Sequence, residues 1–243
     1  MNTFLAEIRQ TVLPNRGSQD GPLPPLLVTL TFVTGLVDAF SYLVLGHVFV
    51  ANMTGNVVFL GFAIAGAPGF SIGASVVALA MFWLGALVGG RVGKSFGTHR
   101  GRLLSTATAI QAAFIGASVI LASLSGSPVT SGYRYALIAV LAIAMGVQNA
   151  AARQIAVPDL TTTVLTLTIT GIAADSAIAG GKGSKSGRRL VAVAAMLVGA
   201  LVGAACVLHV HIVFALVIAL IVLAIVGVTT RILGKSDASW AEG

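Results

Sequence analysis

Long apolar runs alternate with short polar or charged interruptions along most of this chain. We place the apolar segments at residues 26–46, 53–66, 73–92, 103–124, 134–152, 160–178, 190–208 and 212–230. Most approach the roughly 20 residues that a helix needs to cross a bilayer. The chain lacks the short, alternating segments that are typical of transmembrane barrel strands. The pattern therefore predicts an all-α integral membrane protein, a polytopic helical bundle.

The composition supports a membrane protein and argues against a soluble nucleic-acid-binding protein. Hydrophobic residues make up 57% of the chain and charged residues only 9%, whereas soluble domains carry about 25% charged residues. The net charge of +7 does not indicate a nucleic-acid partner. Of the 14 Lys and Arg residues, 12 fall in four clusters that flank apolar segments, beginning at Arg9, Arg91, Lys182 and Arg231. Such clusters are typical of cytoplasmic loops beside lipid.

The basic clusters also limit the topology. The positive-inside rule puts the loops at 94–102 and 180–189 on the same, cytoplasmic side. If every segment crossed, three crossings would separate these loops and place them on opposite sides. One of the fifth and sixth segments must therefore fail to cross fully, and likewise one of the first and second. We expect six net crossings, with cytoplasmic termini at residues 1–25 and 231–243.

Similar strings recur in the same order in the two halves of the chain. They are GLVDA at 35–39 and GVQNA at 146–150, NMTGNVV at 52–58 and DLTTTVL at 159–165, and GALVG at 85–89 and 199–203. The copies begin 111, 107 and 114 residues apart. With an odd number of crossings in each half, residues 26–124 and 134–230 are predicted to form two inverted-topology repeats.

The GALVG strings place glycines four residues apart, at Gly85 and Gly89 and again at Gly199 and Gly203. This spacing lets two membrane helices approach closely. We expect these glycines at helix contacts, either between the two halves or between the protomers of a homodimer.

Polar residues interrupt the apolar pattern once in each half. The first polar motif holds Asn52, Thr54 and Asn56, and the second holds Asp159, Thr161 and Thr163. Matching interruptions in two halves indicate a transporter's binding site, because non-helical backbone at membrane depth needs protein or a water-filled cavity around it. Asn52 and Asp159 are also good N-cap residues for short helices. We expect the pairs 52/159, 54/161 and 56/163 to face one another in one central site.

Few other polar groups lie within the apolar segments. Asp38 lies in the middle of the first, where a charge costs at least ~2.5 kcal/mol, so it either couples solute movement to protons or makes a structural hydrogen bond. Gln148 and Asn149 occupy the matching place in the second half. Arg153 either neutralises Asp159 or holds an anionic solute. Asp175 is expected to neutralise the nearby basic loop.

The strings TGLVDAFSYL at 34–43 and FVANMTGNVVFLG at 49–61 resemble the signature of the YoaK-like bacterial membrane proteins, a family named for domain of unknown function 1275. GVQNAAARQIAVPDLTTTVLTLTITG in the second half also resembles the family pattern. The resemblance implies a multi-pass protein of the bacterial cytoplasmic (inner) membrane. It implies no activity and carries no functional residues over.

The pattern favours a small secondary transporter of a polar or anionic solute, with proton coupling through Asp38. An uncoupled channel or facilitator with the same fold, and an accessory or lipid-binding membrane protein, remain as alternatives. An enzyme is the least favoured class, because we find no metal-ligand cluster, hydrolase motif or nucleotide-binding loop. No cofactor is implied, and the expected partners are the lipid bilayer and the solute.

Overall fold

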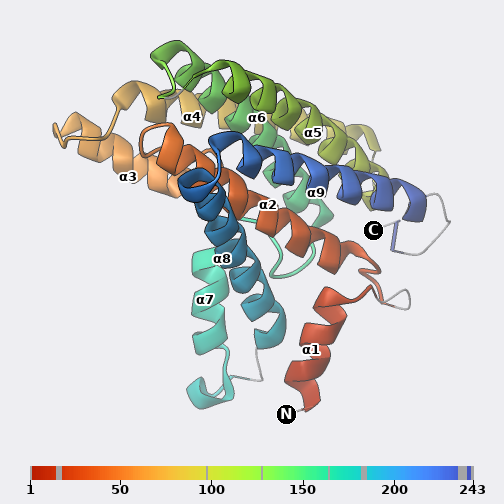
Figure 1. Ribbon diagram of the computed structural model, residues 1–243. Helices are drawn as coiled ribbons and strands as arrows, with labels where there is room; N and C mark the ends of the chain where they lie inside the picture. Colours follow the sequence, from red (N-terminus) through yellow and green to blue (C-terminus); the bar gives the residue numbers. More distant parts are fainter. Residues whose placement is uncertain are drawn as a thin grey trace.

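The computed structural model describes residues 2–14, 18–96, 98–126, 128–163, 165–181, 185–234 and 240–241. Its regular structure is helical throughout these residues (Figure 1). The elements are α1 (Asn2–Val12), α2 (Leu23–Val44), α3 (Met53–Ile64), α4 (Ile72–Phe96), α5 (Arg100–Leu124), α6 (Ser131–Ile155), α7 (Leu165–Ala174), the 3₁₀ turn η1 (Ala177–Ala179), α8 (Ser186–His209) and α9 (Ile212–Leu233).

Six of these helices, α2, α4, α5, α6, α8 and α9, are long and apolar enough to cross a membrane. The helices α3 and α7 have only 12 and 10 residues. At 1.5 Å per residue they are too short for a hydrocarbon core about 30 Å thick. The predicted number of crossings is therefore confirmed, and the segment that fails is the second in each half.

Two boundaries differ from the predicted ones. The first membrane helix begins at Leu23 rather than near residue 26, and Pro24 and Pro25 lie in its first turn. A helix tolerates proline there because the first N–H groups have no partner within the helix. The sixth apolar segment is helical only from Leu165, so the threonines that begin it lie in the connection from α6.

The helices α2 and α6 form the centre of the bundle. Inside the molecule, 61% of the membrane-length window of each is buried, against 22–33% for the other four spans. The outer helices expose large apolar side chains such as Trp83, Leu197 and Ile225. Extended apolar faces of this kind suit hydrocarbon rather than water. The structure is that of a multi-pass membrane protein.

The two halves meet where α2 crosses α8 (Figure 1). A Cβ atom on Gly35 of α2 would lie 2.3 Å from the carbonyl oxygen of Met196 on α8. A Cβ atom on Gly199 would lie 2.1 Å from the carbonyl oxygen of Phe32. Only glycine fits at either position, so the two backbones are in direct contact.

A matching crossing joins α6 to α4. A Cβ atom on Gly146 would lie 2.2 Å from the carbonyl oxygen of Phe82, and one on Gly85 would lie 2.2 Å from the carbonyl oxygen of Ile143. The contacting positions on α6 follow those on α2 by 111 residues, and those on α8 follow those on α4 by 114. The two crossings are thus built from corresponding residues.

The other glycine of each GALVG string lies in the same contacts. A Cβ atom on Gly89 would lie 2.8 Å from the Cβ of Ala150, and one on Gly203 would lie 3.1 Å from the Cβ of Ala39. Of the two arrangements expected from the sequence, the structure shows contacts between the halves. The glycine faces offered for a homodimer are occupied within one chain.

Candidate functional site

The first polar motif is fastened to α2 by Asp38. One carboxylate oxygen accepts hydrogen bonds from the backbone N–H groups of Val50 (3.0 Å) and Ala51 (2.9 Å), and the other accepts one from the side-chain amide of Asn52. Asp38 is buried. All three donors belong to the chain that turns from α2 into α3, so the structural role expected for Asp38 is present in this geometry.

The second polar motif is fastened to α6 in a related way. The hydroxyl of Thr163 donates to Oδ1 of Asn149 at 2.5 Å. In each half, the two bonded residues are 14 positions apart, and Asn149 and Thr163 each lie 111 residues after Asp38 and Asn52. The counterpart of Asn52 is therefore Thr163. The expected pairing 52/159, and with it 54/161 and 56/163, is wrong by four residues.

Asp159 lies away from the place predicted for it. It adopts a left-handed backbone conformation (φ 64°) in the connection between α6 and α7. Because α7 begins at Leu165, Asp159 is not its N-cap. Its carboxylate accepts from Nε of Arg189 at 2.8 Å, and Asp175 accepts from Nη1 of the same guanidinium at 2.7 Å.

These ion pairs decide two alternatives. Asp175 neutralises Arg189, a residue of the basic stretch 180–189, as expected. Asp159 is paired with Arg189 rather than with Arg153. Among the described residues, Arg153 makes no ion pair within 4.0 Å, so its charge is available to another partner.

Two further predicted site residues are enclosed by protein. The amide of Asn56 accepts from the backbone N–H of Phe49 (2.9 Å) and donates to the carbonyl oxygen of the same residue (2.6 Å). The amide of Gln148 donates to the hydroxyl of Thr34 (2.9 Å) and accepts from Nε2 of Gln111 (2.6 Å). Both side chains are buried and serve packing between segments.

The remaining predicted residues line one cavity of about 880 Å³, the central cavity. They are Asn52 and Thr54 from the first motif, Thr161 and Thr163 from the second, and Asn149 and Arg153 from α6. Residues Phe82, Ala86 and Gly90 of α4 and Met196 of α8 add an apolar wall. Arg153 carries the only formal charge among the described lining residues, so the cavity suits a polar or anionic molecule.

Sequence reasoning missed part of this wall. Phe82, Ala86 and Gly90 repeat every four residues along one face of α4. That spacing is a signal for a shared helix face, but it does not tell a cavity wall from a helix contact. Gln154, which follows Arg153 in the sequence, also lines the cavity. No pattern in the sequence marks it as a site residue.

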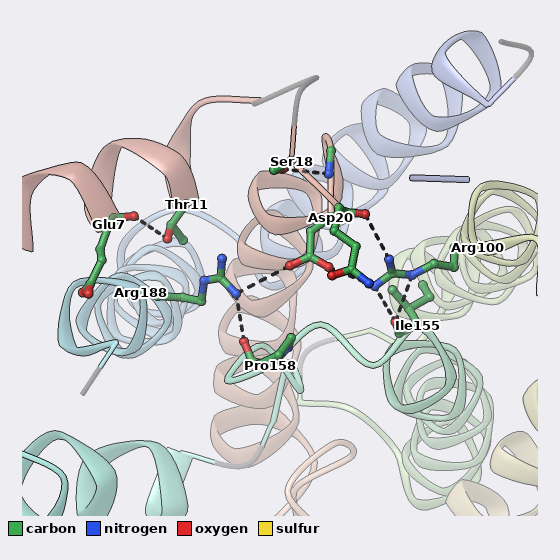
Figure 2. A network of polar contacts seen from close by, with 10 residues as sticks. Glu7, Thr11, Ser18, Asp20, Arg100, Ile155, Pro158 and Arg188 are labelled. Atoms are coloured by element: carbon green, nitrogen blue, oxygen red, sulfur yellow. Dashed lines mark hydrogen bonds and ion pairs between the residues drawn. The ribbon is translucent and has the colours of Figure 1, made fainter. Parts of the chain in front are cut away.

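Close to the central cavity, the basic segments meet in a polar network (Figure 2). Asp20 pairs with Arg100 (3.2 Å) and Arg188 (3.8 Å). Arg100 also donates to the carbonyl oxygen of Ile155, at 2.8 Å from Nη2, and Arg188 donates to that of Pro158 at 3.3 Å. The N-terminal ends of α5 and α8 thus lie together, as expected for two basic loops on the same side of the membrane.

The chain ends approach this same end. The backbone N–H of Arg100 donates to the carbonyl oxygen of Ala241 at 2.8 Å. Gly21 lies against the side chain of Trp240. Arg16, Lys182 and Lys235, which belong to the predicted basic clusters, lie outside the described residues.

The first half has an aromatic cluster where the second half has charges. Tyr42, which lies 111 residues before Arg153, stacks on Phe49 with ring centroids 5.1 Å apart. His47 and Phe59 extend the cluster. Because this counterpart of Arg153 is packed among rings, the positive charge of the central cavity comes from the second half.

Comparison with known proteins places the chain in a family. It is 35% identical over 156 residues to the UPF0700 transmembrane protein YoaK of Bacillus subtilis (strain 168). That alignment covers 62% of this chain and 65% of the relative, so the chain spans slightly less than two thirds of the relative's length. No solved structure matches it. The family model described as "Protein of unknown function (DUF1275)" matches residues 26–229, and the chain belongs to that family of membrane proteins.

Proposed function

We propose that this protein is a small secondary transporter for a polar or anionic solute that binds in the central cavity. The observation that carries the proposal is the convergence of the two polar motifs. They come from different halves of the chain and line one cavity of about 880 Å³ together with Arg153, which forms no ion pair with the described residues. Paired interruptions at the interface of two repeats are typical of transporter sites.

The proposal includes an inverted repeat. Three of the six spans fall in each half, so the second half enters the membrane in the opposite direction to the first. The corresponding residues of the α2–α8 and α4–α6 crossings support a two-fold axis in the membrane plane between the halves. In this arrangement the basic end, with both termini, faces the cytoplasm of a bacterial cell.

The short helices are the elements proposed to move. In the described structure, α3 packs against α4 alone among the helices, and α7 packs against α8 and the η1 turn. Elements with few partners open at low free-energy cost. The helix α3 carries Thr54 and Asn56 of the first polar motif, and α7 begins just after the second, so movement of either helix would open or close the central cavity on one side.

Proton coupling is assigned to Asp38. Its carboxylate accepts three hydrogen bonds from residues 50–52, and a carboxylate in this position offers acceptors only. Protonation would turn one oxygen into a donor and break the bond that it accepts. Residues 50–52, and α3 after them, would then be released from α2.

Uptake by proteoliposomes tests the proposal. The purified protein is reconstituted, and uptake is measured for a panel of small organic anions and inorganic phosphate. We expect saturable uptake of at least one anion, with counterflow, which a channel does not show. Arg153→Ala should reduce uptake about tenfold or more, the loss expected for one charge-assisted hydrogen bond worth ~1.5–3 kcal/mol. Arg231→Ala removes a cation that is not among the described lining residues of the cavity, and this variant should transport normally.

Two results contradict the proposal. One is no uptake of any probe by protein that remains monodisperse and folded. The other is uptake that Arg153→Ala and Arg231→Ala leave equally unchanged.

A further inference from the structure

A second cavity, of about 500 Å³, lies at the basic end of the molecule. Its described lining includes the charged residues Asp20, Arg100 and Lys185, and we call it the basic cavity. Gln154 lines both the basic cavity and the central cavity, and it is the one described residue that the two linings share. Gln154 therefore borders both cavities.

The side chain of Gln154 fits into a recess on α4. Its Nε2 donates to the carbonyl oxygen of Gly90 at 3.2 Å. A Cβ atom on Gly93 would lie 1.4 Å from its Oε1, so the amide fills the space that the missing side chain leaves. Gln154 thus spans the gap between α6 and α4 at a point that borders both cavities.

The backbone beneath Gln154 is held in place. The carbonyl oxygen of the next residue, Ile155, accepts from both Nε (3.1 Å) and Nη2 (2.8 Å) of Arg100. Ala156 then ends α6 in a left-handed conformation (φ 56°), with its N–H bonded to the carbonyl oxygen of Ala152. The side chain of Gln154 is consequently the part free to change, and exposed side chains change rotamer in picoseconds to nanoseconds.

We infer that Gln154 is the gate between the central cavity and the basic cavity, and that the basic cavity is the vestibule through which an anionic solute passes. The vestibule part rests on the proposed function. Two cations, Arg100 and Lys185, stand against the single carboxylate of Asp20 in its described lining. A cavity with this balance raises the local concentration of anions. The gate itself can be tested without any transported solute.

Thiol labelling tests the gate. In a Cys206→Ser background, Ala86→Cys reports on the central cavity, one turn from Gly90 on α4, and Thr98→Cys reports on the basic cavity. A membrane-impermeant methanethiosulfonate is added to the side of the basic loops. With Gln154 present, Thr98→Cys should react quickly and Ala86→Cys slowly. Gln154→Ala should speed labelling of Ala86→Cys about tenfold, the factor for a ~1.4 kcal/mol change, and leave Thr98→Cys unchanged.

Gly93→Ala provides a second, independent variant. Its Cβ would occupy the recess and expel the amide of Gln154, so it should also speed labelling of Ala86→Cys. Added to Gln154→Ala, it should have no further effect, because both changes remove the same barrier. This variant keeps the test decisive if Gln154→Ala fails to fold.

Equal labelling of Ala86→Cys with and without the Gln154 side chain, in folded protein, would overturn the gate. The two proposals fail separately. Faster labelling without uptake of any anion supports the gate and removes the transporter. Unchanged labelling with intact uptake removes the gate and leaves the transporter.

Discussion

At the scale of single residues, Asp38 holds the chain between α2 and α3 by hydrogen bonds within the membrane segment. A buried carboxylate that accepts three N–H donors holds the first polar motif in place. Asp38→Asn keeps one oxygen acceptor but faces the amide of Asn52 with a second donor. We expect a folded protein, because the two backbone N–H groups share one oxygen, with uptake that no longer responds to an imposed proton gradient. Proteoliposome uptake with and without the gradient measures this, and a full response in Asp38→Asn would exclude Asp38 as the coupling group.

The polar residues of the candidate site can be predicted from the sequence more readily than the correspondence between the two halves. Asp38 and Asn52 stand out because polar groups are costly within apolar segments. Thr163 was matched to Asn56 instead of Asn52, because Asp159 and Asn52 are chemically similar and drew the alignment four residues away. The hydrogen bonds in the structure restore a constant offset of 111. Gln154 gave no signal, because its importance depends on the recess at Gly93.

At the scale of elements, glycines at the helix crossings join the two halves. The same change, glycine to alanine, should have opposite effects on stability at a crossing and away from one. Gly199→Ala would place a Cβ 2.1 Å from the carbonyl oxygen of Phe32 and force α2 from α8. Overpacking of this kind costs about 1–3 kcal/mol. Gly61→Ala on α3 meets nothing within 4 Å and should be neutral or stabilising by up to ~1 kcal/mol. Thermal unfolding in detergent measures both, and equal effects would contradict this account of the crossings.

Apolar runs and basic clusters predict the membrane segments and the number of crossings, but they do not predict which segments form short helices. Within each pair, 26–46 with 53–66 and 134–152 with 160–178, both segments are apolar, and hydropathy does not say which segment of the pair crosses the membrane. The difference depends on tertiary contacts. Asp38 and Asn149 hold the chain beside each polar motif against a neighbouring span, so the helix that follows begins late. The apolar pattern predicts a segment from about residue 160 and so includes the threonines at 161–163, which the structure places before α7.

At the scale of the whole molecule, the polar network of Figure 2 places the basic loops at one end. We expect Lys94→Cys and Lys185→Cys, each in the Cys206→Ser background, to resist an impermeant thiol reagent in intact cells. Both should react in inverted vesicles, because the positive-inside rule puts both loops in the cytoplasm. Labelling of one in intact cells, with the other protected, would remove the inverted-repeat arrangement.

Solute protection is the most direct measurement of the central claim that both polar motifs form one site. Thr54→Cys on α3 and Thr161→Cys in the second motif line the same cavity from different halves. Each is labelled, without Cys206, at rising concentrations of the anion that gives the highest uptake. The account predicts that the anion slows both reactions with the same half-maximal concentration, and that Arg153→Ala weakens both protections together. Protection of only one cysteine, or of neither at concentrations that saturate uptake, would contradict it.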